Sequence, residues 1–95
     1  MGAFPKDTIG KQLARAVDSI SANIAEGFGR YHKKDKVKFY RYSIGSVMEV
    51  LDWNEKSKLR GLLSQNEYEY IFQELTKLPK AINSLIKFTN EKLKV

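Results

Sequence analysis

The sequence predicts an all-helical protein that associates with further copies of itself. Apolar residues recur every three or four positions in three stretches, at about residues 7–29, 35–61 and 66–88, and no stretch alternates apolar and polar residues as a strand does. Glycines or polar turn residues separate the stretches. At 95 residues the chain forms one domain, residues 1–95, which is small enough to gain stability from oligomerisation.

The charge of the chain is basic and uneven. Seventeen Lys and Arg residues against eleven Asp and Glu give a net charge of +6, and residues 1–48 hold nine basic and four acidic residues. A basic partner surface is therefore expected in the first half and not in the near-neutral second half. The absence of cysteine excludes a disulfide framework, and no apolar run reaches the ~20 residues of a membrane span. These features predict a cytoplasmic protein.

The first helix is expected to begin at Asp7 or Thr8, directly after Pro5, because either side chain can accept a hydrogen bond from the opening turn. Gly27 and Gly29 are expected to end it, since glycine adopts the left-handed cap conformation without a Cβ penalty. The apolar residues of this stretch fall within about a third of the helical wheel. They are Ile9, Leu13, Ala16, Val17, Ile20, Ile24 and Phe28.

The second helix is expected to run from a cap at Asp35 to about Gly61, which is about 40 Å at 1.5 Å per residue. It carries two apolar stripes. The first comprises Val37, Tyr40, Ile44, Val47, Met48, Leu51, Leu59 and Leu62. The second lies roughly opposite and comprises Phe39, Tyr42, Val50 and Trp53. Because a helix at the edge of a small monomer buries only one face, the second stripe predicts an interface with a partner chain.

The third helix is expected to begin at an Asn-x-x-Glu capping pair, Asn66 and Glu69. Pro79 lies within this run and removes a backbone donor, so a kink between Leu75 and Pro79 is expected rather than an end. One face is apolar, and it comprises Tyr68, Ile71, Phe72, Leu75, Leu78, Ile82, Leu85 and Ile86. Tyr70, Ala81 and Phe88 lie on the other face, which repeats the indication of a partner chain.

A motif at the end of the first helix resembles a known family. Residues 19–30 read Ser-Ile-Ser-Ala-Asn-Ile-Ala-Glu-Gly-Phe-Gly-Arg, and a basic loop and a long helix with Ser43-Ile44-Gly45-Ser46 and Glu49-Val50-Leu51 follow. The combination resembles the four-helix-bundle proteins encoded in intervening sequences of bacterial large-subunit ribosomal RNA genes. That family includes the accessory protein of diversity-generating retroelements. The resemblance implies an antiparallel helical bundle that assembles into a ring-like homopentamer with a basic surface. In the accessory protein, that surface serves nucleic acid and a reverse transcriptase.

The resemblance covers Phe4 to the C-terminus, with two departures. Ser21 stands where family chains usually have proline, so a bend of the first helix at that point does not carry over from the family to this chain. The chain opens at Phe4-Pro5-Lys6, which resembles the connection after the first helix of the family. Three helices of a four-helix-bundle fold are therefore expected. Either the chain is a shortened form, or a neighbouring chain fills the vacant side.

The candidate nucleic-acid site is the basic segment at the turn between the first two helices. Six cations occur within twelve residues, and they are Arg30, Lys33, Lys34, Lys36, Lys38 and Arg41. Tyr31, Phe39, Tyr40 and Tyr42 interleave with them, a pattern that favours phosphate contacts with base stacking. The alternative is a solvated helix start. The wheel positions of Phe39, Tyr40 and Tyr42 favour a place in the core or an interface.

No catalytic residue, cofactor or metal site is predicted. Asn23 and Glu26 are interpreted as bracing a helix contact, and Glu26 lies four residues before Arg30, at the spacing of a helical ion pair. His32 is the single histidine and lies among cations, which disfavour a bound metal. The sequence therefore predicts a non-enzymatic protein that binds RNA or DNA, with a possible polymerase or reverse transcriptase partner. The alternative is a protein-protein scaffold with no nucleic-acid role.

Overall fold

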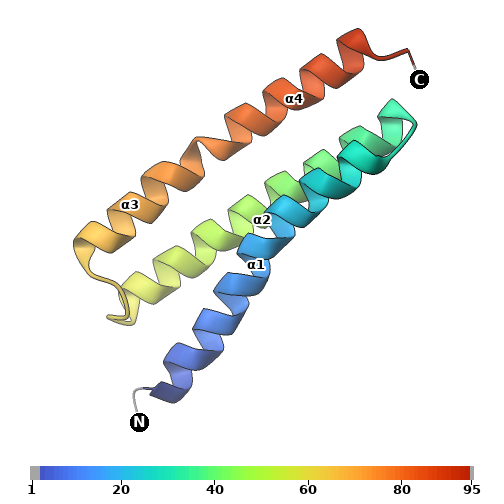
Figure 1. Ribbon diagram of the computed structural model, residues 1–95. Helices are drawn as coiled ribbons and strands as arrows, with labels where there is room; N and C mark the ends of the chain where they lie inside the picture. Colours follow the sequence, from blue (N-terminus) through green and yellow to red (C-terminus); the bar gives the residue numbers. More distant parts are fainter. Residues whose placement is uncertain (1–2, 95) are drawn as a thin grey trace.

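The computed structural model describes residues 3–94, with side chains from Ile9 onward. Over that range it contains four helices and no strand: α1 (Ala3–Gly29), α2 (Lys33–Leu59), α3 (Gln65–Thr76) and α4 (Leu78–Lys92) (Figure 1). The predicted all-helical class is confirmed. Because α4 continues α3 in nearly the same direction, the chain has three long arms (Figure 1).

The arms form an open arrangement with α2 in the middle. α2 packs against α1 on one side and against α3 and α4 on the other, whereas within the described residues no Cα atom of α1 lies within 8 Å of α3 or α4. The Cα atoms extend over 54 × 22 × 13 Å, so the molecule is elongated and thin. In a closed three-helix bundle every helix would contact both others. Here α2 alone joins the two outer arms.

The core follows the inner side of α2. Its fully buried cluster consists of Ala16, Tyr40, Val47, Val50, Leu75, Ile82 and Ile86. Val50 was predicted to face a partner chain, but it is only 1% exposed within this single chain, and Trp53 packs against the same cluster. The second stripe of α2 is thus partly explained by the chain itself. Conversely, Met48 and Leu59, predicted as core, are exposed because they lie on the side of α2 that faces neither arm.

Polar and small residues bring α1 and α2 close together. The Ser43 hydroxyl donates a hydrogen bond to the carbonyl oxygen of Ile20 at 2.8 Å, and the hydroxyls of Ser19 and Ser46 lie 2.8 Å apart. A Cβ atom on Gly27 would lie 2.4 Å from the ring of the buried Tyr40. Gly27 therefore serves close packing inside the helix.

The ends of α1 differ from the prediction. The helix begins at Ala3, earlier than predicted, because Pro5 falls in the first turn, where a backbone N–H needs no helical partner. The side chains of Asp7 and Thr8, the predicted caps, lie outside the described residues. The helix ends at Gly29 as predicted, but without a left-handed glycine.

A left-handed glycine occurs instead after α2, at Gly61, which has φ of 72°. Gly61 was the approximate predicted end of this helix. The Leu62 N–H donates to the carbonyl of Ser57 at 2.9 Å, and the Gly61 N–H donates to that of Lys58 at 3.0 Å. These two bonds form a Schellman motif, which satisfies the last carbonyls of the helix.

Two predicted caps are wrong. The cap position of α2 is His32, whose side chain makes no capping bond, and Asp35 lies in the first turn, where its charge favours the helix N-terminus. In α3 the cap is Ser64, which forms a capping box with Glu67 in place of the predicted Asn66–Glu69 pair. α2 ends at Leu59, about two residues before the predicted end, and α3 begins at Gln65. Asn66 therefore lies inside α3 and not at its boundary.

The predicted interruption between Leu75 and Pro79 is present, but it is a full break rather than a kink. α3 ends and α4 begins on either side of Lys77, whose φ of −77° and ψ of −24° keep the chain direction nearly helical. Pro79 lies in the first turn of α4 and has no N–H for the carbonyl of Leu75. The Lys77 N–H donates to that carbonyl instead.

Candidate nucleic-acid interface

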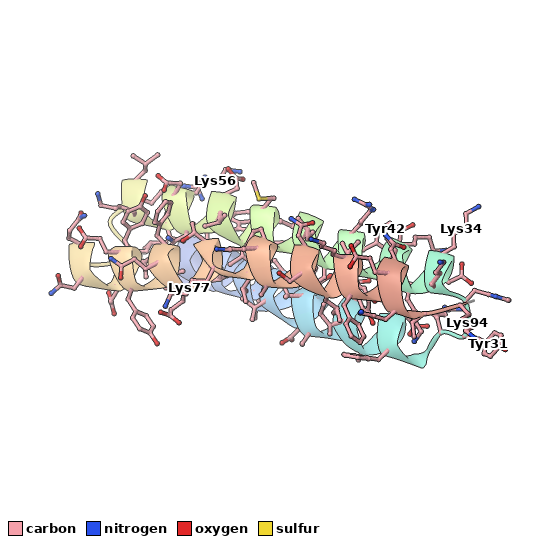
Figure 2. The ribbon with its side chains drawn as sticks, turned by 90° about the horizontal axis from the view of Figure 1, so that it is seen from above. Tyr31, Lys34, Tyr42, Lys56, Lys77 and Lys94 are labelled. Atoms are coloured by element: carbon pink, nitrogen blue, oxygen red, sulfur yellow. The ribbon has the colours of Figure 1, made fainter. Side chains whose placement is uncertain are left out.

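The turn between α1 and α2 and the last turn of α4 lie at the same end of the molecule. The Lys33 ammonium group donates to the carbonyl oxygens of Asn90 and Leu93, each at 3.3 Å. Figure 2 shows Tyr31, Lys34 and Lys94 together at this end, with Lys77 and Lys56 away from it. We name this region, residues 26–42 and 87–94, the basic end.

Two of the six predicted cations cap helices. Lys33 reaches the last carbonyls of α4, and Lys36 donates to the carbonyl oxygens of Gly27 and Phe28 at 3.3 and 2.9 Å, at the end of α1. Both ammonium groups thus lie at helix C-termini, where the helix dipole is negative and the last carbonyls lack the N–H partner of a continuing helix. The Lys36 contact explains why α1 ends without a left-handed glycine.

Two more cations rest on the ring of Phe39. The Arg30 guanidinium lies 4.7 Å and the Lys38 ammonium 5.1 Å from the ring centroid. Arg30 also pairs with Glu26 at 2.6 Å, which confirms the predicted helical spacing. Phe39 is half-buried, so this ring holds the two cations at the surface.

Lys34, Lys38 and Arg41 form a single exposed line on α2. They lie four and three residues apart, which places them on one side of a helix over two turns. Within the described part of the chain, neither Lys34 nor Arg41 has an ion-pair partner. We name these three residues the free cation line, because within the described residues they are the predicted cations that neither cap a helix nor form an ion pair.

The sequence-based expectation overlooked the lysines of α4. Residues 49–76 hold six acidic and three basic residues, whereas residues 77–94 hold five basic and one acidic residue. The net charge of the whole second half is close to zero, and this sum concealed the acidic and the basic segment. Because α4 returns to the α1–α2 turn, its last cations, Lys87 and Lys92, and Lys94 just after the helix join the basic end.

The aromatic residues of the basic segment separate into buried and exposed ones. Tyr40 is buried in the core, as its wheel position predicted, and burial raises the pKa of its hydroxyl. Tyr31 is 73% exposed and Tyr42 is 53% exposed. Tyr42 therefore does not belong to the core of this chain, and both rings stand among cations.

The remaining candidate residues have local structural contacts. Asn23 donates to the carbonyl and hydroxyl oxygens of Ser19, one turn earlier in its own helix, at 2.8 and 3.1 Å. The exposed His32 makes an edge contact with the ring of Tyr31. Among the described side chains, no three His, Cys, Asp or Glu residues gather in a way that could hold a metal ion. None of the described helices is long and apolar enough to cross a membrane.

An apolar groove lies between the two outer arms. Its volume is about 340 Å³, and its lining consists of Leu13, Val17, Val50, Tyr70, Ile71, Glu74 and Leu75. A smaller hollow of about 120 Å³ shares Leu13 and reaches toward the end of α2, where Leu62 and Leu63 line it. The groove exists because α1 and α3 flank α2 without contacting each other.

Comparison with known proteins gives one match. No curated protein and no solved structure matches the chain. The family model of the 23S rRNA-intervening sequence protein matches residues 3–84, which include α1, α2, α3 and the first half of α4. The match agrees with the resemblance of the motif at residues 19–30. The chain belongs to the 23S rRNA-intervening sequence protein family.

Proposed function

We propose that this protein is a non-enzymatic, cytoplasmic nucleic-acid-binding protein that contacts the phosphates of RNA or DNA through its basic end. The observation that carries the proposal is the free cation line of Lys34, Lys38 and Arg41, which is exposed and lies at the end where the last lysines of α4 also gather. Cations on one face attract a polyanion, and the release of its counterions supplies affinity without base recognition. By family resemblance, the nucleic acid is ribosomal RNA or the template of a reverse transcriptase partner.

The distribution of charge along the molecule supports this orientation. α3 contains three acidic residues and no basic one, and it lies at the opposite end from the α1–α2 turn (Figure 1). An approaching nucleic acid is therefore attracted more strongly to the end with the α1–α2 turn than to the end with α3. The field of the whole chain thus directs the polyanion to the free cation line.

The proposal includes assembly into an antiparallel helical-bundle oligomer, with five copies favoured by family resemblance. The open groove between α1 and α3 supports it, because Val17 and Tyr70 line that groove and remain exposed in the single chain. A ring would repeat the basic end once per copy, and several weak contacts would then act together. Multiplicity would raise the affinity beyond that of three cations.

A charge reversal at the basic end tests the nucleic-acid proposal. The variant carries Lys34→Glu, Lys38→Glu and Arg41→Glu, and binding of a labelled oligonucleotide is followed by fluorescence anisotropy over a range of salt concentrations. We expect loss of binding at moderate salt. Where residual binding is measurable, the slope of log K against log salt falls by about 2 for a single strand.

The matched control reverses three exposed cations away from the basic end, Lys11, Arg60 and Lys80. The net charge changes by the same amount, so the control separates local contacts from total charge. We expect it to retain most of the binding and the parent slope. Equal loss in both variants, or no loss in the first, would contradict the proposal. Circular dichroism checks that helicity is unchanged.

The apolar groove favours a second candidate function, a protein-binding scaffold with no nucleic-acid role. Under this alternative Val17→Glu would reduce the mass measured by light scattering, whereas the charge reversal would alter neither assembly nor partner binding. Leu59→Glu is the control, because Leu59 is exposed on α2 outside the groove. If the parent protein fails to bind RNA or DNA at low salt, the scaffold is the better supported of the two functions.

A further inference from the structure

We propose that the basic end binds nucleic acid as a single strand, with bases stacked on the rings of Tyr31 and Tyr42. The inference rests on the proposed function, because the same cations hold the phosphates. It adds the class of nucleic acid and two residues that act on bases rather than on charge.

The two tyrosines present open ring faces. Tyr31 is 73% exposed, in the turn before α2, and its ring meets that of His32 at 5.1 Å between centroids with an interplanar angle of 79°. Tyr42 is 53% exposed and meets Phe39 at 5.6 Å and 86°. A perpendicular contact covers at most one face of a ring. Each tyrosine therefore keeps at least one face on which a base can stack.

Cations and rings are joined into one surface. Phe39 contacts the Tyr42 ring while holding the Arg30 guanidinium and the Lys38 ammonium over its own ring. A phosphate bound by Lys38 therefore lies beside the ring of Tyr42, and the attached base can reach it. Alternating positive charge and aromatic surface is the arrangement by which proteins hold single strands without sequence preference.

The spacing suits a strand of several nucleotides. Tyr42 lies nine residues beyond the start of α2, which is about 14 Å along the helix axis. Tyr31 precedes that start, and Figure 2 shows it on the other side of the same end. A length of about 14 Å corresponds to about four nucleotides at the stacked spacing of 3.4 Å, so a strand that contacts both rings spans several nucleotides.

A duplex cannot stack its bases on the exposed tyrosine rings of this surface. Its bases already stack on one another, so a tyrosine ring gains a base face only if the duplex is opened, at a cost of a few kcal/mol. The exposed groups at this end are cations and aromatic rings, which suit the backbone and the base faces of a single strand.

The test compares a labelled oligothymidine of about 16 nucleotides, the upper end of typical single-strand sites, with a duplex of the same length. The variants are Tyr31→Leu, Tyr42→Leu and the pair, in the full chain. Stacking on one ring contributes about 1–3 kcal/mol, so we expect each leucine to weaken single-strand binding about tenfold, which corresponds to 1.4 kcal/mol. Duplex binding and the salt slope for the single strand change by less than a factor of two.

Phenylalanine at the same two positions is the matched control, because it keeps the ring and loses only the hydroxyl. We expect Tyr31→Phe and Tyr42→Phe to bind the single strand like the parent. Unchanged single-strand binding in the leucine pair, or equal weakening of strand and duplex, would overturn the stacking inference. In either case the phosphate proposal stands if the reversal of Lys34, Lys38 and Arg41 still abolishes binding. If that reversal has no effect either, both proposals fail.

Discussion

Replacement of Gly27 by alanine tests the close contact between α1 and α2. In a free helix this change stabilises by about 0.5–1 kcal/mol, because alanine loses less backbone entropy. Here the new Cβ would lie 2.4 and 2.8 Å from two ring carbons of Tyr40 and 3.1 Å from the carbonyl oxygen of Lys36. Tyr40 is fully buried and cannot swing away, and overpacking of this kind costs about 1–3 kcal/mol. We expect Gly27→Ala to lower the free energy of unfolding by about 1–2 kcal/mol.

Thermal unfolding followed by circular dichroism measures the effect at one fixed protein concentration. For a domain of this size 1 kcal/mol shifts Tm by about 4–8 °C, so Gly27→Ala should lower Tm by about 5–15 °C. Gly45→Ala is the control, since Gly45 is exposed inside α2 and its added Cβ would have no heavy atom within 4 Å. That variant should raise Tm by about 2–8 °C. A Tm for Gly27→Ala at or above the parent value would refute the close contact.

Three further outcomes are expected. Asn54 is 1% exposed and donates to the Tyr68 carbonyl at 3.2 Å, but its side-chain oxygen has no partner among the described residues, so Asn54→Leu should raise the free energy of unfolding in urea by about 1–3 kcal/mol; a loss would show that a water satisfies the oxygen. Lys33→Met should increase amide exchange in the last turn of α4 while leaving α1 unchanged, and equal protection in parent and variant would argue against the cap. The hydrogen bond to Glu55 raises the pKa of Tyr68 above its usual value of 10, so the stability that this bond gives is present below pH 10 and is lost as pH rises through the folded pKa. Tyr68→Phe should remove that part of the alkaline loss in denaturation curves, and an identical pH dependence in parent and variant would contradict it.

Periodicity predicted the helices well, because the spacing of apolar residues records which side of each helix is buried. It could not say what covers a second apolar side. Val50 and Trp53 indicated a partner chain, yet within the single chain Val50 is buried and Trp53 is partly buried against the core. A helical wheel identifies an apolar stripe, but only the tertiary structure shows which residues pack against it.

Cap residues were harder to predict, because several suitable side chains compete near each boundary. Ser64 and Asn66 both have a side chain that can cap a helix. The direction that the chain takes after Gly61 determines that α3 begins directly after Ser64. At the start of α1, Pro5 was taken as a boundary although the first turn of a helix accepts proline.

The sequence predicted which charged residues form the candidate site, but it did not predict their positions relative to one another in space. The sequence identifies Lys33 as basic, whereas the carbonyls that its ammonium group contacts belong to residues 57 and 60 positions later. Exposure likewise decides the role of the tyrosines, since Tyr40 and Tyr42 differ by two positions and point into and out of the core. The lysines of α4 were missed because their position near the α1–α2 turn depends on the return of the third arm.

The open arrangement of the arms also bears on how the chain comes apart. Since α1 and the α3–α4 arm each pack on α2, and within the described residues no Cα atom of one arm lies within 8 Å of the other, the closest backbone neighbour of each arm is α2. Such a chain has two partly independent units of local unfolding, joined through a common helix. The α3–α4 arm carries the capping contact with Lys33 at one end and the Asn54 hydrogen bond at the other, while α1 and α2 form a hairpin of near neighbours in sequence. Release of the third arm would therefore expose the inner side of α2 to an incoming helix while the hairpin that bears the free cation line stays folded.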